Sequence, residues 1–80
     1  MLPVVSGKKL ISFLTKLGYR VVRRRGSHVQ LKCDTKNGSH SITVPMHNEI
    51  AKGTLNDILN SVSLWLNMSK DELLTQMKKA

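Results

Sequence analysis

The sequence KNGS at residues 36–39 constrains the fold most, because it lies between two short segments that are rich in β-branched and apolar residues. Asn-Gly is the preferred pair for the two-residue loop of a type I′ β-hairpin. With this pair as the loop, Leu31 faces Val44. The next pair, Cys33 and Ile42, then falls on the same side of the ladder. The turn sequence and the apolar pattern of the flanking segments agree, and together they predict an antiparallel hairpin with one buried face.

The other side of this hairpin is polar. The same alternation places on it His28, Gln30, Lys32, Ser41 and Thr43. The segment YRVVRRR precedes the hairpin and is joined to it by Gly-Ser, so it is expected to form a third antiparallel strand.

Two further segments have apolar residues at helical spacing. In SGKKLISFLTKLG, Ser6 is the expected N-cap and Gly18 the expected terminator. A second helix is expected to begin at Thr54, with Asp57 completing a capping box. Ser69 is the expected cap of a short third helix. The apolar stripes are Leu10, Phe13, Leu14 and Leu17 in the first helix, and Leu55, Ile58, Leu59, Val62 and Leu66 in the second.

These elements predict an α+β fold in the order α-β-β-β-α-α. We expect a three-stranded antiparallel sheet with the helices on one face and solvent on the other. A chain of 80 residues forms one domain, residues 1–80, with its core at residues 6–66 and the extra C-terminal helix at residues 69–79.

The distribution of charge points to a polyanionic partner. Thirteen basic and five acidic residues give a net charge of +8. Residues 1–40 hold nine of the basic residues and a single acidic one, Asp34, whereas residues 41–80 hold four of each sign. A positive electrostatic field confined to one half of a chain is typical of a surface that binds nucleic acid. A merely soluble basic protein, or a domain that meets an acidic protein partner, remains an alternative.

Several other classes of protein are not expected. The lone Cys33 allows no internal disulfide and favours a reducing cytoplasm. The sequence contains no run of eighteen apolar residues, so we expect no membrane-spanning segment. The start of the chain does not resemble a signal peptide. The histidines, Cys33 and the scattered carboxylates lack metal-site spacing, and no nucleotide-binding motif is present. We therefore expect no metal and no cofactor.

The sequence RRRGSH, residues 23–28, carries the candidate chemistry. A neutral histidine can take a proton from a ribose 2′-hydroxyl, and arginines can hold the phosphate and disfavour protonation of that histidine. Gly26 permits close backbone approach, and Ser27 adds a hydroxyl. The alternative for His28 is an ordinary solvated strand residue after a turn. Alternation cannot place all three arginines on the face of His28.

The order and spacing of four segments resemble the HicA family, also called YcfA-like proteins, of toxins from type II toxin–antitoxin systems. The segments are GKKLISFLTKLGY, VVRRRGSHVQL, ITVPMH and KGTLNDIL, and they cover residues 7 to about 62. The resemblance implies a double-stranded-RNA-binding-domain-like fold. It also implies a metal-independent endoribonuclease that cleaves mRNA and is neutralised by a HicB-like antitoxin.

The resemblance also implies roles for individual residues. The catalytic histidine of the family follows the Gly-Ser pair and corresponds to His28, and the histidine of VPMH makes His47 a secondary candidate. The candidate RNA-binding residues are Arg23, Arg24, Arg25, Gly26, Ser27, Lys32, Lys8, Lys9 and Lys52. A single lysine at the start of the second helix, Lys52, favours single-stranded mRNA over a duplex. A non-catalytic RNA-binding module that uses the same basic surface is the alternative function.

Overall fold

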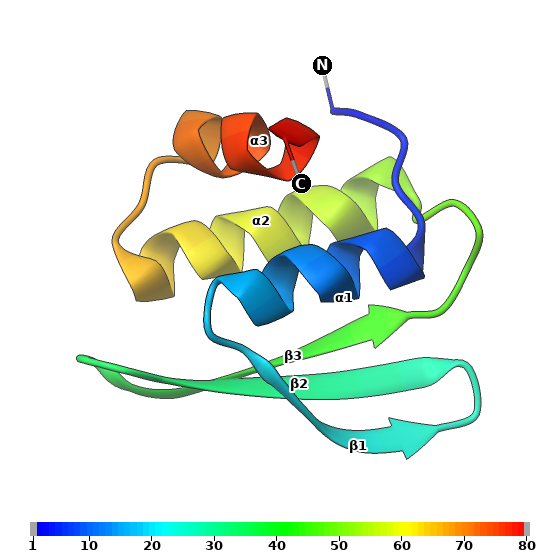
Figure 1. The fold of residues 1–80 in the computed structure, drawn as a ribbon, viewed down its shortest axis with the longest axis horizontal. Coiled ribbons are helices and arrows are strands. Elements are labelled where there is room, and N and C mark those ends of the chain that lie inside the picture. Colours follow the sequence, from blue (N-terminus) through cyan, green and yellow to red (C-terminus); the bar gives the residue numbers. More distant parts are fainter. Residues whose placement is uncertain (1, 80) are drawn as a thin grey trace.

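A computed structural model describes residues 2–79 of the chain. Its elements are α1 (Gly7–Lys16), β1 (Arg20–Arg25), β2 (His28–Thr35), β3 (Gly38–Pro45), α2 (Lys52–Leu66) and α3 (Lys70–Lys79). The strands form an antiparallel sheet in the order β1-β2-β3 (Figure 1). Helices α1 and α2 cover one face of the sheet, and α3 packs on the far side of these helices. The predicted α+β class, element order and double-stranded-RNA-binding-domain-like arrangement are confirmed.

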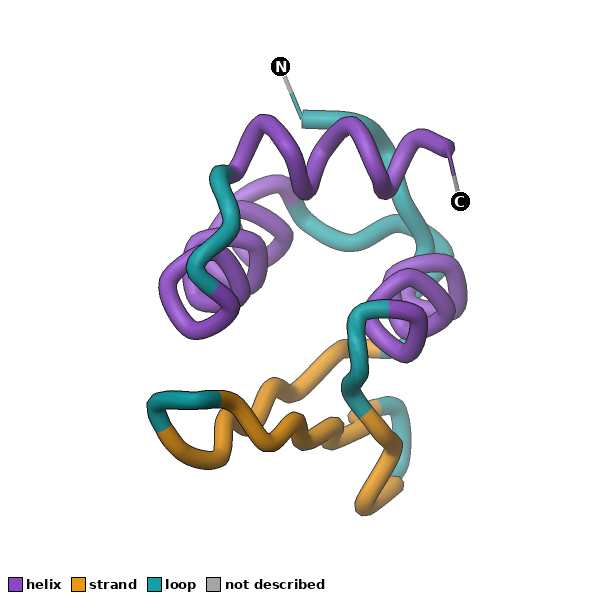
Figure 2. Tube along the Cα trace, turned by 60° about the vertical axis from the view of Figure 1, so that its left-hand side comes forward, coloured by secondary structure: helices purple, strands orange, loops and turns teal. Residues whose placement is uncertain are grey.

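The other face of the sheet, which we call the outer face, is covered by no helix of residues 2–79 (Figure 2). The apolar core lies between the sheet and the helices, and it includes the fully buried Leu10, Leu14, Leu31 and Leu55. The outer face is therefore open to a ligand approaching from solvent.

Helix α1 begins and ends as the sequence predicts. The Ser6 hydroxyl accepts a hydrogen bond from the Lys9 backbone N–H at 3.0 Å, which makes Ser6 the N-cap. Gly18 follows the helix with a φ of +112°, a left-handed conformation that glycine adopts without steric cost.

Helix α2 begins two residues earlier than predicted, at Lys52 rather than Thr54. Its N-cap is Ala51, and no side chain caps it, so the predicted capping box is wrong. The chain is instead fixed just before the helix, where the Ile50 N–H donates to the Val5 carbonyl at 2.8 Å. This long-range backbone bond has no signature in the local sequence.

Helix α3 begins after the predicted cap. The Ser69 hydroxyl accepts from the Glu72 N–H at 3.1 Å. Leu73 and Met77 are buried, so this helix contributes to the same core as the other elements.

The turn between β2 and β3 differs from the prediction. Thr35 pairs with Gly38, so the loop residues are Lys36 and Asn37. The Thr35 hydroxyl accepts from the Asn37 N–H at 3.1 Å and donates to the Gly38 carbonyl at 2.7 Å. Gly38 has a φ of +115°, whereas Asn37 has no positive φ. This pattern is typical of a type I turn followed by a left-handed glycine, and not of type I′.

The different turn moves every predicted pair by two residues. Leu31 faces Ile42 instead of Val44, and Cys33 faces His40 instead of Ile42. Because side chains alternate with a period of two, a shift of two leaves each residue on its predicted face. The predicted faces are confirmed, and the predicted partners are wrong.

His40 is the buried polar residue that the sequence analysis did not single out. Its Nδ1 lies 2.7 Å from the Tyr19 hydroxyl, and its ring stacks on Trp65 with the centroids 5.0 Å apart. Burial lowers the pKa of His40. Burial also raises the pKa of Tyr19 to about 12, and the nearby Cys33 thiol adds to this effect. His40 therefore has a structural role on the helix side of the sheet.

Candidate nucleic-acid interface

A two-residue turn places His28 at the start of β2. Arg25 pairs with His28, which leaves Gly26 and Ser27 as the loop. Gly26 has a φ of +58°, and glycine at the first loop position is typical of a type II′ turn. The Ser27 carbonyl accepts from the Met46 N–H at 2.6 Å, so the turn is held against the end of β3.

A β-bulge decides which arginines share a face with His28. Val22 has no partner between two paired positions of β1. Counting from Val21, unbroken alternation would place Arg24 on the outer face. The bulge reverses the alternation, so that Arg23 and Arg25 lie there instead. The prediction that only some of the three arginines accompany His28 agrees with this register.

Cross-strand partners form rows across the outer face. The first row holds Arg25, His28 and Pro45, the second holds Arg23, Gln30 and Thr43, and the third holds Arg20, Lys32 and Ser41. Neighbouring rows are about 7 Å apart, because same-face residues are two positions apart along a strand.

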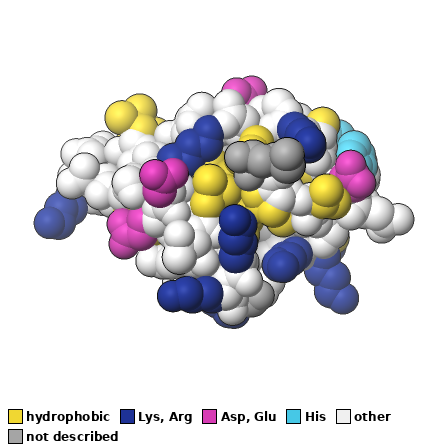
Figure 3. Space-filling view, turned by 90° about the horizontal axis from the view of Figure 1, so that it is seen from above, with side chains coloured by type: hydrophobic (Ala, Val, Ile, Leu, Met, Phe, Trp, Pro, Cys, Tyr) yellow, Lys and Arg dark blue, Asp and Glu magenta, His cyan; other side chains and the backbone are white. Residues whose placement is uncertain are grey.

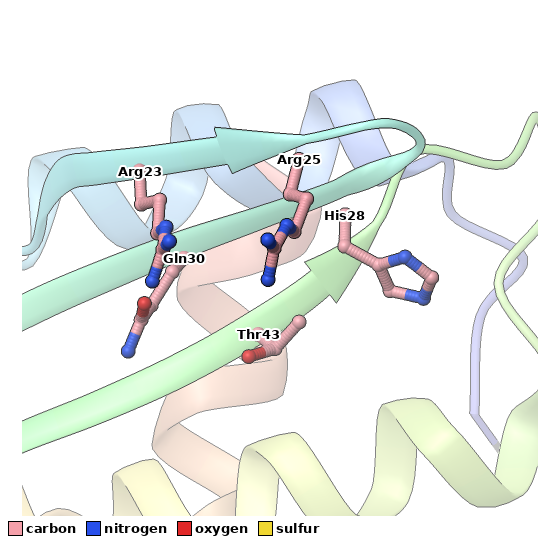
Figure 4. Close-up of a pocket in the computed structure, with 5 residues that line it drawn as sticks. All are labelled: Arg23, Arg25, His28, Gln30 and Thr43. Atoms are coloured by element: carbon pink, nitrogen blue, oxygen red, sulfur yellow. The ribbon is translucent and has the colours of Figure 1, made fainter.

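The first two rows enclose a hollow of about 210 Å³ (Figure 4). It is lined by Arg23, Arg25, His28, Gln30 and Thr43. Figure 4 shows Arg23 and Gln30 at one end of the hollow, His28 at the other, and Arg25 between them. Gln30 and Thr43 were predicted on this face without a role, and the period-two alternation was the signal that could have assigned them to the site.

The hollow has two cations and no carboxylate among its lining residues. Within residues 2–79 the one ion pair joins Arg20 and Asp34 at 3.6 Å, so Arg23 and Arg25 have no acidic partner. The helix side of the molecule is different, since acidic side chains lie among the basic ones there (Figure 3). The hollow is therefore suited to an anionic ligand.

The side chains of the hollow are also free to meet a ligand. None of the side-chain hydrogen bonds among residues 2–79 involves His28 or Gln30. His28 is exposed and Gln30 is half-buried.

Two of the other predicted residues lie on the sheet itself. Lys32 is on the outer face in the third row, one row beyond Gln30. Arg24 pairs with Val29, whose side chain is buried on the helix side, so Arg24 points away from the face of His28. The structure thus separates Arg24 from the hollow.

The remaining predicted lysines lie on the helices. Lys8 and Lys9 are exposed in the first turn of α1, and Lys52 is exposed at the start of α2. Figure 1 shows both of these helix starts at the same end of the molecule as the β1–β2 turn. Gly7 brings α1 onto the end of β3, because its N–H donates to the His47 carbonyl at 2.9 Å.

His47 lies just beyond the strand. β3 ends at Pro45, which pairs with His28, so His47 is two residues past the partner of His28. Its side chain is exposed and does not line the hollow. The structure brings His47 to the same end of the sheet as His28 without placing it in the hollow.

The described residues offer neither a cluster of metal-ligating side chains nor a membrane-spanning helix. Among residues 2–79, no three side chains of His, Cys, Asp and Glu are grouped so that they could hold a metal ion. In the same part of the chain, no helix has the length and apolar character needed to cross a membrane.

Comparison with known proteins identifies the family. No curated protein and no solved structure matches the chain. The model of one protein family, described as the HicA toxin of bacterial toxin–antitoxin systems, matches residues 7–64. This stretch is more than half of the chain and contains α1, the sheet and most of α2. The chain therefore belongs to the HicA family of bacterial toxins, whose members act in toxin–antitoxin systems.

Proposed function

We propose that this toxin is a metal-independent endoribonuclease that cleaves single-stranded mRNA and so inhibits translation in the cytoplasm. The observation that carries the proposal is the hollow that His28 lines at one end and Arg23 at the other, with Arg25 between them and no carboxylate among the lining residues. A base that shares a hollow with two guanidinium groups, neither of them paired with a carboxylate, suits cleavage by an internal 2′-hydroxyl.

In the proposed reaction His28 removes the proton from the ribose 2′-hydroxyl. The 2′-oxygen then bonds to phosphorus, and the bond from phosphorus to the 5′-oxygen breaks. The 5′-oxygen takes up a proton from solvent or from His47, the second candidate for proton transfer. The products are a 2′,3′-cyclic phosphate and a 5′-hydroxyl. Arg25, with Arg23, stabilises the charge that develops on the phosphate oxygens.

The rest of the basic surface extends the RNA site in this proposal. Lys32 binds a phosphate two rows from His28, and the exposed Lys8, Lys9 and Lys52 continue the track at the same end of the molecule. We further propose that the antitoxin partner of the family is a HicB-like protein that neutralises this toxin.

The decisive experiment is cleavage of a single-stranded RNA in EDTA by the wild type and by His28→Ala. We expect cleavage by the wild type and a loss of about 10²–10⁴-fold in the variant, which is the contribution of a general base. Lys78→Ala is the matched control, because it also truncates an exposed, ionisable side chain but lies on α3. Circular dichroism and RNA binding should be the same for all three proteins.

Equal cleavage by the wild type and His28→Ala would contradict the assignment of His28. Products with free 3′-hydroxyl ends would contradict the cyclic-phosphate mechanism.

A non-catalytic RNA-binding module is the second candidate. It is favoured by one observation: within residues 2–79 no hydrogen bond orients the His28 ring, as a dedicated base would ordinarily require. Intact RNA binding with no cleavage in EDTA by the wild type would favour this alternative.

A further inference from the structure

The proposed cleavage chemistry uses the first row of the outer face and the charge of Arg23, but it gives no role to Gln30. This side chain lies in the second row between Arg23 and Thr43, and it lines the same hollow as His28 (Figure 4). Its carboxamide makes no hydrogen bond to residues 2–79, and it offers both donors and an acceptor. A half-buried amide beside a phosphate site is suited to reading the edge of a nucleobase.

The distance between rows places this amide next to the reacting nucleotide. Gln30 and His28 are two positions apart on one strand, which is about 7 Å. A single nucleotide can span this distance, so a base attached to the backbone held at His28 and Arg25 can reach Gln30.

No Phe, Tyr or Trp side chain among residues 2–79 lies on this face. The chain has three aromatic residues, Phe13, Tyr19 and Trp65. Phe13 and Tyr19 are buried in the core, and Trp65 stacks on His40 on the helix side. None of these three can stack a base on the outer face, so stacking there is left to His28 and the arginines, and hydrogen bonding to Gln30 and Thr43.

We propose that Gln30, with the Thr43 hydroxyl beside it, forms a nucleobase-binding subsite that prefers adenine to uracil next to the cleaved phosphate. The carboxamide of glutamine pairs best with a base edge on which a hydrogen-bond donor lies beside an acceptor. Adenine presents this arrangement on both its Watson–Crick and its Hoogsteen edge, whereas uracil presents it only on its Watson–Crick edge. The subsite rests on the proposed function, because it assumes that RNA occupies the hollow.

The test measures binding without cleavage. Hexanucleotides of adenosine or uridine carry 2′-O-methyl groups, so that no 2′-hydroxyl can react, and their affinity is measured by fluorescence anisotropy in EDTA. We expect the wild type to bind the adenosine hexamer at least about fivefold more tightly than the uridine hexamer. Gln30→Ala should lose this preference, chiefly because its affinity for the adenosine hexamer falls.

Gln76→Ala is the matched control, because Gln76 is the other glutamine of the chain and is exposed on α3. It should bind both hexamers like the wild type. The subsite is overturned if the wild type binds the two hexamers equally, or if Gln30→Ala retains the preference. No binding to either hexamer would overturn the subsite and the proposed function together.

The two proposals fail separately in the remaining outcomes. A preference for the adenosine hexamer that depends on Gln30, with no cleavage of unmodified RNA in EDTA, supports the subsite and contradicts the proposed nuclease activity. Cleavage that depends on His28, with no base preference, supports the nuclease and contradicts the subsite.

Discussion

Two glycines show how the backbone at a single residue determines what that residue tolerates. A Cβ added at Gly26 or at Gly53 would meet no atom within 4 Å, so neither position is sterically closed. Gly26 has a φ of +58°, however, while Gly53 is helical. We expect Gly26→Ala to lower the free energy of unfolding by about 1–2 kcal/mol, because an L-residue is strained in the left-handed region. Urea denaturation measures this change.

Gly53→Ala is the control for the Gly26 substitution. It adds the same methyl group in equally open space, but in a helix, where alanine is preferred to glycine by up to about 1 kcal/mol. It should therefore raise the free energy of unfolding. Equal effects of the two substitutions would show that the Gly26–Ser27 turn does not depend on a positive φ.

His40 shows which residues the sequence could have assigned. It has the same parity as Ile42 and Val44 in β3, and both of these were predicted to face the core. The alternation therefore contained the information that His40 is buried. Its partners could not be predicted, because Tyr19 and Trp65 reach it from distant parts of the chain.

At the level of elements, the β1 bulge makes a prediction about three adjacent arginines. Each substitution by alanine removes one positive charge from the same strand, so the long-range field changes equally in all three variants. Only Arg23 and Arg25 lie on the face of His28. We expect Arg23→Ala and Arg25→Ala each to lower the salt dependence of single-stranded RNA binding by about 0.7 in log–log slope, which corresponds to one lost phosphate contact.

Arg24→Ala serves as the control in this series, because it faces away from the hollow. It should leave the salt dependence near that of the wild type. Equal changes in all three variants would mean that RNA responds to the net charge of β1 and not to its register.

The elements also differ in how far the local sequence determines them. The helix-capping residues Ser6 and Ser69 act on backbone groups three residues away, so a local pattern was sufficient to predict them. The bulge at Val22 and the start of α2 depend on contacts with β2 and with Val5, and no local pattern encodes them. The same limit applies to the candidate site. His28 and its turn were predictable from the local sequence, but which arginines share the face of His28 was not, because that depends on the bulge.

Considered as a whole, the molecule separates its charged surface from its structural histidine. The hollow and His28 are on the outer face, whereas His40 is on the helix side with Tyr19 and Trp65. This second cluster joins three parts of the fold, since Tyr19 precedes β1, His40 lies in β3 and Trp65 lies in α2. Because the cluster joins distant parts of the chain, we expect its protonation state to affect the stability of the entire domain.

We expect this cluster to limit stability on both sides of neutral pH. The pKa of His40 is lowered by burial from its ordinary value of 6.5. Below about pH 6.5 the unfolded chain therefore binds a proton that the folded protein excludes, and the free energy of unfolding falls. The pKa of Tyr19 is raised from 10.0 to about 12. Above pH 10 the unfolded chain releases a proton that the folded protein retains, and the free energy of unfolding falls again.

Urea denaturation between pH 5 and pH 11 measures both limits, and two variants assign them. His40→Gln lacks the titrating ring, so its free energy of unfolding should fall less than that of the wild type on the acid side. Tyr19→Phe lacks the phenol hydroxyl, so its free energy of unfolding should fall less than that of the wild type on the alkaline side. His47→Gln removes an exposed histidine and should retain the pH dependence of the wild type. A full acid-side loss in His40→Gln would show that stability in acid is governed by groups outside this cluster.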